Sequence, residues 1–329
     1  MKLPVLRPDD TIWLDYDLAA EDDSKLLASL STLVTVGPFL WTASDECRTL
    51  ECLERDGKNF RLRTQLRLDD IFGGLPGKDD GDEVDVEAID AANGNLWICG
   101  SHCRVRKKPK KDKTLNPELR DRESRHLLGH AKLLAKGTAL AAQGTALPFE
   151  SENSLRAVLQ RENAYIAPFI DLPSKENGLD IEGMCIAKGK VFLGLRGPLV
   201  DSIAIILEAR IAQSGGLDPS KMITHLVDLR GLGVRDLTRV DGALLVLAGP
   251  VSGADEPFRI YRWRPKTTEL IQKPDAVCEW PRNDETPEGI CRLDNGGKPG
   301  FAVLYDSPDP ARIKGTRYRA DWIAAGKIG

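Results

Sequence analysis

The stretch Asn177-Gly178-Leu179-Asp180-Ile181-Glu182-Gly183-Met184 decides the fold, because its central phrase recurs along the chain. A glycine and the apolar run Val191-Phe192-Leu193 follow it, and the unit closes on Arg196-Gly197-Pro198. The same order of phrase, turn and apolar run returns elsewhere, with phrases that begin at Leu30, Asp85, Gly233 and Thr286. Self-similarity with strands inside every unit indicates a repeat architecture, and the period is typical of an all-β fold, the β-propeller.

The spacing of the phrases sets the number of blades. Equivalent positions in the copies are Ser31, Glu87, Glu182, Arg235 and Glu288, and successive positions are 56, 95, 53 and 53 residues apart. A four-stranded blade takes about 40–50 residues, so each short step fits one blade with long loops. The long step is either an insertion or a further blade. We favour five blades; six blades, one of them degenerate, is the alternative.

The residues in the long step favour the insertion. A basic, proline-containing stretch after His102 is typical of a loop, and residues 126–134 are predicted to form an outer strand. Residues 151–163 are predicted to form a helix, because Leu155, Val158 and Leu159 share one face. We therefore place a basic loop and helix insertion at about residues 103–165, within a single propeller domain spanning 1–329.

The two ends of the chain predict how the ring closes. The last copy supplies too few strands for a complete blade, whereas residues 11–18 alternate like a strand but belong to no blade. Pairing this N-terminal strand into the last blade would close the ring and remove two free strand edges.

Composition describes an ordinary globular protein. The chain has 329 residues, 41% hydrophobic and 29% charged, with a formal net charge of −4. Nothing in this balance calls for a nucleic-acid or membrane partner, and we expect neither. The N-terminus lacks the apolar run of a signal peptide, and the seven cysteines include no Cys-x-x-Cys pair. We therefore expect free thiols and a cytoplasmic location.

The propeller topology predicts where chemistry would occur. Innermost strands line the central channel, and the second strand of each blade returns to the same rim. Acidic side chains therefore converge on one mouth, and oxygen ligands suit Ca²⁺ or Mg²⁺. The predicted metal ligands are Asp45, Glu87, Glu182, Glu288 and Asp306. The predicted catalytic residues are His102, Arg196 and Arg235, with the arginines suited to an anionic group. No other cofactor is expected.

A purely structural role is the competing interpretation. A carboxylate that recurs in successive blades can accept backbone N–H bonds at each blade junction. The copies that depart from the repeat, at Ser31 and Arg235, are more informative in this respect. Zinc is disfavoured at His126 and His130, because their segment is a predicted strand. The basic run at 104–113 lacks interleaved aromatic residues, which favours a solvated loop.

Several of these phrases, taken in order from about residue 28 to 325, resemble a bacterial family, domain of unknown function 3616. The phrases are Trp41-Thr42-Ala43-Ser44-Asp45-Glu46, residues 177–183, Leu195-Arg196-Gly197-Pro198, residues 229–236 and Tyr305-Asp306-Ser307-Pro308. The resemblance implies a propeller and no particular activity. The pairs Glu182-Gly183 and Glu288-Gly289 also resemble the Glu-Gly phrase of gluconolactonase-type and phytase-like esterase propellers. The resemblance to gluconolactonase-type propellers implies that the Glu of this phrase ligates a divalent metal at the channel mouth.

Two functions follow as hypotheses. The first is a divalent-metal-dependent hydrolase of an ester, lactone or phosphoester, with its site at the channel mouth. The alternative is a non-catalytic scaffold that binds a protein or a small ligand, engaged through the basic run at 104–113. An enzyme requires convergent acids that lack a cationic partner, whereas in a scaffold each acid would be neutralised by an arginine or bound to backbone.

Overall fold

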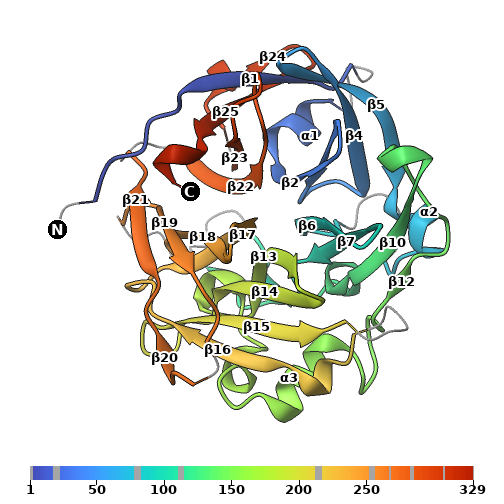
Figure 1. Ribbon diagram of the computed structural model, residues 1–329. Helices are drawn as coiled ribbons and strands as arrows, with labels where there is room; N and C mark the ends of the chain where they lie inside the picture. Colours follow the sequence, from blue (N-terminus) through green and yellow to red (C-terminus); the bar gives the residue numbers. More distant parts are fainter. Residues whose placement is uncertain are drawn as a thin grey trace.

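The computed structural model describes residues 3–17, 23–77, 83–109, 115–211, 217–251, 256–266, 268–281, 285–306 and 308–328. Within these ranges the chain forms five antiparallel blades arranged as a ring (Figure 1). The innermost strands are β2 (Leu30–Val36), β6 (Val86–Ala92), β13 (Asp180–Ala187), β17 (Gly233–Val240) and β22 (Thr286–Arg292). Each of them contacts the innermost strand of the blade on either side. The predicted propeller with five blades is confirmed.

The second strand of each blade pairs with the innermost strand and returns to the phrase-bearing rim. These strands are β3 (Phe39–Ser44), β7 (Asn95–Gly100), β14 (Lys190–Gly197), β18 (Ala243–Gly249) and β23 (Gly300–Asp306). The outer strands of the first blade are β4 (Thr49–Asp56) and β5 (Asn59–Arg67), and those of the second are β10 (Leu128–Leu134), β11 (Ala139–Leu140) and β12 (Thr145–Ala146). The outer strands of the third blade are β15 (Ala204–Arg210), β16 (Ile223–Val227) and β20 (Ile271–Gln272), and those of the fourth are β19 (Arg259–Trp263) and β21 (Asp275–Glu279).

The N-terminal strand closes the last blade, as the sequence predicts. Strand β1 (Asp10–Asp15) pairs antiparallel with β25 (Arg317–Ala324) and parallel with β5 of the first blade. Figure 1 shows β1 running along the outer edge between these two strands. The pairing covers edges of both blades that would otherwise present unpaired backbone groups.

Apolar residues fill the space between neighbouring blades. The described residues form five buried clusters, one at each blade interface. Successive residues of an inner strand face opposite sides, so Val246 packs toward the third blade and Leu247 toward the fifth. Burial on both faces explains why strands such as Leu244-Leu245-Val246-Leu247 read as continuous apolar runs.

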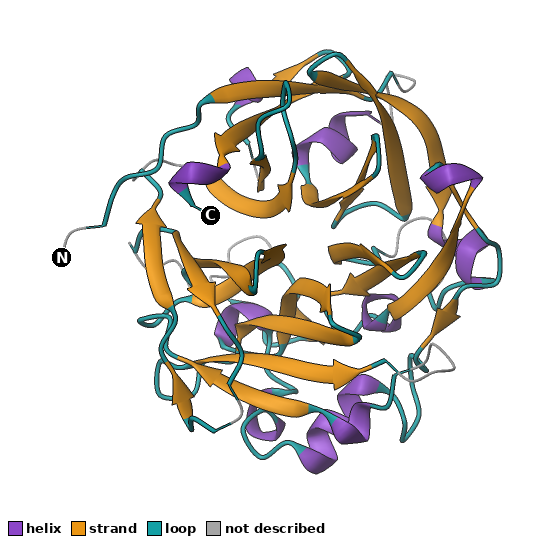
Figure 2. Cartoon of the chain, viewed as in Figure 1, coloured by secondary structure: helices purple, strands orange, loops and turns teal. Residues whose placement is uncertain are grey.

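The segment between the second and third blades contains the predicted helix. Helix α3 (Leu155–Glu162) begins at Ser154, whose side chain accepts a hydrogen bond from the Ala157 N–H. Leu155 and Leu159 pack into the cluster between these blades, on the outside of the ring (Figure 2). Residues 166–172, which lead into the third blade, contain a turn of 3₁₀ helix (Ala167–Phe169). The corresponding segment that leads into the fourth blade is strand β16.

The basic run forms part of a hairpin. Strand β8 (Val105–Arg106) pairs with β9 (Leu119–Arg120), and residues 110–113 of the run lie outside the described residues. Arg104 binds Asp121 and Asp171, Arg106 binds Glu176, and Lys107 binds Glu118. Arg104, Arg106 and Lys107 are therefore matched by nearby carboxylates. None of the described helices is long and apolar enough to cross a membrane.

Candidate metal centre at the channel mouth

Every innermost strand carries a β-bulge at the same position of the recurring phrase. In each innermost strand, the pairing with the second strand skips one or two residues. The skipped residues include Ser31 in β2, Glu87 in β6, Glu182 in β13, Arg235 in β17 and Glu288 in β22. A bulge leaves one residue outside the ladder and re-aims its side chain. The recurring phrase therefore encodes a bulge, and the bulge gathers three glutamates and one arginine around the channel.

The Glu-Gly pairs have an architectural reason for their glycine. A Cβ added to Gly183 would lie 3.1 Å from the backbone of Asp236, and one added to Gly289 would lie 2.9 Å from the Ser31 carbonyl oxygen. The glycine is required because the next blade approaches closely at this point. Close packing against the next blade thus explains the glycine of the Glu-Gly pairs that resemble other propellers.

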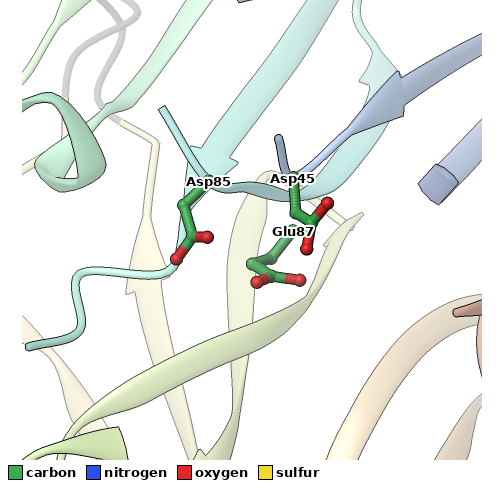
Figure 3. Close-up of side chains that lie close together, drawn as sticks. All are labelled: Asp45, Asp85 and Glu87. Atoms are coloured by element: carbon green, nitrogen blue, oxygen red, sulfur yellow. The ribbon is translucent and has the colours of Figure 1, made fainter. Parts of the chain in front are cut away.

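Two groups of carboxylates share Glu87. One ligand atom from each of Asp45, Asp85 and Glu87 lies within 4.8 Å of the others, and the same holds for Glu87, Glu182 and Glu288. Figure 3 shows the first group turned toward a common space. Asp45 follows β3, Asp85 precedes β6 and Glu87 lies at the bulge of β6. The fold thus brings together predicted ligands that are far apart in sequence.

Glu182 and Glu288, the members of the second group other than Glu87, are paired with arginine. Arg235 lies 3.0 Å from Glu182 through its Nε, and it donates a short hydrogen bond to Glu288. Arg196 binds Glu182 at 2.8 Å and Asp180 at 2.5 Å. All of these carboxylates are buried, so removal of a guanidinium would leave buried negative charge.

The first group has less positive charge beside it. Asp85 binds Arg125 at 3.0 Å and accepts a hydrogen bond from Ser101. Among the described residues Glu87 has no hydrogen bond and no ion pair, and the Oδ1 atom of Asp45 is buried without a partner. Because an enzyme requires convergent acids that lack a cationic partner, Asp45 and Glu87 are the acids expected of a binding site.

Burial and mutual repulsion raise the pKa values of Asp45, Glu87 and Glu288. Burial, Asp85 and Asp306 raise the pKa of Asp45 to about 8. Burial raises the pKa of Glu87 well above its usual range, and Asp85, Glu182 and Glu288 add to the effect. Burial also raises the pKa of Glu288, although Arg235 opposes the shift. With a pKa of about 8, Asp45 retains its proton near neutrality unless another cation stabilises its charged form.

A cavity adjoins the group. It has a volume of about 680 Å³, and its walls include Ser29, Asp45, Glu46 and Asp306. Asp306 is half-buried at the end of β23. The cavity gives a small molecule a route to Asp45.

His102 occupies a different environment. It belongs to neither carboxylate group and is buried, with its Nδ1 2.9 Å from the Gly100 carbonyl oxygen. Its ring stacks on His126 with centroids 5.9 Å apart, and burial lowers its pKa to about 3. The imidazole is therefore neutral. His130, the other histidine of that segment, lies against Trp97.

Asp85, Asp180 and Arg125 also belong to the site but were not among the predicted site residues. A signal for the two aspartates is present in the sequence, because each stands two residues before a bulge glutamate, in Asp85-Val86-Glu87 and Asp180-Ile181-Glu182. Arg125 carries no such signal, since it reaches Asp85 from the segment that precedes β10.

Fold and site together define a class, a five-bladed propeller within the described residues, with an acidic channel mouth partly neutralised by arginines. The chain belongs to the family described as protein of unknown function (DUF3616), whose model matches residues 29–321. The family prediction is confirmed. No curated protein matches the chain in sequence.

Solved structures resemble the chain only distantly. The glutaminyl cyclase of Myxococcus xanthus is 10% identical, with a TM-score of 0.47 over 98% of this chain and 99% of that one. A GH43 β-1,3-galactosidase is 9% identical, with a TM-score of 0.48 over 98% of this chain and 60% of that one. The β-propeller domain of Cps50 (Swd1) from Myceliophteria thermophila is 10% identical, with a TM-score of 0.37 over 96% and 98% of the two chains.

Proposed function

We propose that the channel mouth binds a divalent cation, Ca²⁺ or Mg²⁺, and that the protein is a metal-dependent hydrolase of an ester, lactone or phosphoester. The observation that carries the proposal is the convergence of Asp45 and Glu87, two carboxylates without a cationic partner among the described residues, on the same space as Asp85. Hard divalent cations take carboxylate oxygens as ligands.

Each predicted residue has a place in this proposal. Asp45, Asp85 and Glu87 hold the cation, Glu182 and Glu288 lie on the other side of Glu87, and Asp306 lines the adjoining cavity. A bound cation would polarise a carbonyl or phosphoryl oxygen and lower the pKa of a bound water. Binding the cation releases the proton that Asp45 holds near neutrality, because its charged form is then paired.

The arginines suit an anionic part of the substrate. Arg196 retains 17% of its side-chain exposure, while its guanidinium is held by Asp180 and Glu182. A guanidinium fixed in this way presents its remaining donors without further ordering. His102 remains a predicted catalytic residue, and its contacts support a positioning role, since its ring nitrogen lies against the Gly100 carbonyl next to Ser101, which binds Asp85.

The test is calorimetric titration of chelator-stripped protein with Ca²⁺ and with Mg²⁺. We expect one ion to bind, with affinity lost by more than about tenfold in Glu87→Gln and in Asp45→Asn. Glu54→Gln is the matched control, because Glu54 is half-exposed on the outer strand β4, away from the channel. Absence of binding by the unchanged protein, or equal binding by all variants, would refute the metal site. Hydrolysis is then assayed with p-nitrophenyl acetate, p-nitrophenyl phosphate and a δ-lactone.

The second candidate, a non-catalytic scaffold, is favoured by the pairing of Glu182 and Glu288 with Arg235. In that case the arginines and glutamates serve to hold blades together at the channel. Cation binding without turnover of any of the three ester classes would support the scaffold. The contacts of Arg104, Arg106 and Lys107 with nearby carboxylates argue against this described part of the basic run as its docking element.

A further inference from the structure

A second cavity lies at the opposite end of the channel strands. It has a volume of about 430 Å³ and is lined by the ends of β13, β14, β17 and β18, between the third and fourth blades. Glu182 lies five residues before Ala187, which lines this cavity, so about 16 Å of strand separates the two sites. The cavity is therefore distinct from the channel mouth, and an inference about it does not depend on the proposed function.

Every charged side chain described in the wall of this cavity is basic. The cations are Lys188, Lys190 and Arg239, and no Asp or Glu is present among the described lining residues. The protein as a whole carries a formal net charge of −4, so this concentration of positive charge runs against its composition. A concave surface lined by one sign of charge concentrates ligands of the opposite sign.

Apart from Asn93, the rest of the wall is apolar or glycine. Phe192, Leu244 and Pro265 contribute to it, and Phe192 is buried. The ring of Phe192 is held edge-on by Trp263, with centroids 5.9 Å apart and an interplanar angle of 88°. Small-molecule sites combine an apolar wall with a few placed polar groups, and their volumes are about 300–1,000 Å³. The cavity matches this description.

Buried side chains hold the ammonium group of Lys190 in place. Lys190 lies 2.6 Å from Glu208, a buried carboxylate that also contacts the His225 Nε2 at 3.1 Å. The side-chain amide of Gln272 donates to the His225 Nδ1, and its oxygen accepts from the Trp263 indole N–H. This arrangement fixes His225 as the tautomer that carries its proton on Nε2, which donates to Glu208. The ammonium group of Lys190 is thereby anchored at the cavity wall.

The other two cations of the wall, Lys188 and Arg239, differ in their contacts. Lys188 and Gly189 both have positive φ, 52° and 72°, which is the geometry of a two-residue hairpin turn. Among the described residues Lys188 is exposed and has no ion pair. Arg239 binds Asp90 at 3.2 Å and also donates to the Ile186 and Ala91 carbonyl oxygens. Lys188 therefore offers charge that no described carboxylate neutralises.

We propose that this cavity binds a small organic anion, with its phosphate or carboxylate group at Lys188 and Lys190 and its apolar part against Phe192. The basic lining and the apolar wall supply the two halves of this recognition. Phosphate and carboxylate share the chemistry that a lysine pair recognises, and the choice between them is made by experiment.

The test is calorimetric titration of the full chain in the presence of chelator, which keeps a phosphate from binding a cation at the channel mouth. The probes are phenyl phosphate, benzoate, inorganic phosphate and benzyl alcohol. We expect phenyl phosphate or benzoate to bind saturably, and inorganic phosphate and benzyl alcohol at least about tenfold more weakly, since each lacks one half of the ligand.

Lys188→Glu should weaken binding of the better probe by about tenfold or more, because it reverses the charge at the wall. Lys136→Glu is the matched control, since Lys136 is also an exposed lysine with positive φ, 63°, and does not line the cavity. Equal affinity of the two variants, tighter binding of benzyl alcohol than of both anions, or no saturable binding by the unchanged protein would overturn the proposal. Circular dichroism of both variants establishes that they are folded.

Discussion

Glu87 and Glu182 lie at the same bulge position of neighbouring innermost strands and bring carboxylate oxygens within 4.8 Å of each other, yet only Glu182 is bound by guanidinium groups. Two arginines hold Glu182, whereas Glu87 has no ion pair among the described residues. Two equivalent positions of the repeat therefore differ in charge environment. This difference separates an architectural carboxylate from one that is available to a ligand.

The contribution of Asp45 to the stability of the cation-free protein should fall as pH rises from about 4 to 8. Asp45 has a pKa of about 8 in the fold, above its ordinary value of 3.8, so between these values the folded protein holds a proton that the unfolded chain has lost. The free energy of unfolding then decreases with rising pH. Thermal unfolding in chelator at pH 5, 6, 7 and 8 measures the slope.

Asp45→Asn should reduce that slope, because the amide does not titrate. It should not abolish it, since burial raises the pKa of Glu51 to about 7 and that of Asp180 to about 7 as well. If Ca²⁺ or Mg²⁺ binds at this group, it should restore stability most strongly at the higher pH values. A slope unchanged in Asp45→Asn would contradict the assignment of this proton.

Removal of Arg235 should destabilise the fold strongly. Arg235→Met leaves Glu288 buried without its cation and removes one of two guanidiniums from Glu182. We expect the free energy of unfolding to fall by about 3–5 kcal/mol, measured by urea denaturation. The double variant Arg235→Met/Glu288→Gln should recover part of the loss. A single variant with unchanged stability would mean that Glu288 is protonated and neutral in the fold.

The close approach of the fifth and first blades should make Gly289 sensitive to a single methyl group. A Cβ at Gly289 would lie 2.9 Å from the Ser31 carbonyl oxygen and 3.0 Å from Leu33. Gly289→Ala should therefore cost about 1–3 kcal/mol of stability by overpacking. Gly326→Ala is the control, because a Cβ there meets nothing within 4 Å, and its effect should stay within about 0.5 kcal/mol.

The N-terminal strand should stabilise the whole ring. Leu14 of β1 is fully buried in the cluster between the fifth and first blades. Leu14→Ala should lower the free energy of unfolding by about 2–5 kcal/mol. Leu270→Ala, at a leucine that is 78% exposed, should have little effect. Urea denaturation compares the two, and a neutral result at Leu14 would show that closure of the ring does not limit stability.

The recurring phrase did not predict the hydrogen bonds that join neighbouring blades. Asp236 follows Arg235 and stands where Glu182 and Glu288 are followed by glycine. In the structure its carboxylate accepts hydrogen bonds from the backbone N–H groups of Ile290, in the next blade, and Leu237. Asp90 makes the equivalent bond to Ile186, and Thr32 to Ile89. These side chains join neighbouring innermost strands and have an architectural role.

The sequence by itself determined the repeat and the closing strand and favoured five blades over six, because these depend on local patterns of apolar residues and glycine turns. It also placed Asp45, Glu87, Glu182 and Glu288 at one mouth, since antiparallel return is a property of every blade. The burial of His102 and the arginine pairing of Glu182 were decided only by the tertiary structure. The reason is that Arg235 joins neighbouring innermost strands that are 53 residues apart in sequence, and blade packing alone sets which side chains meet there.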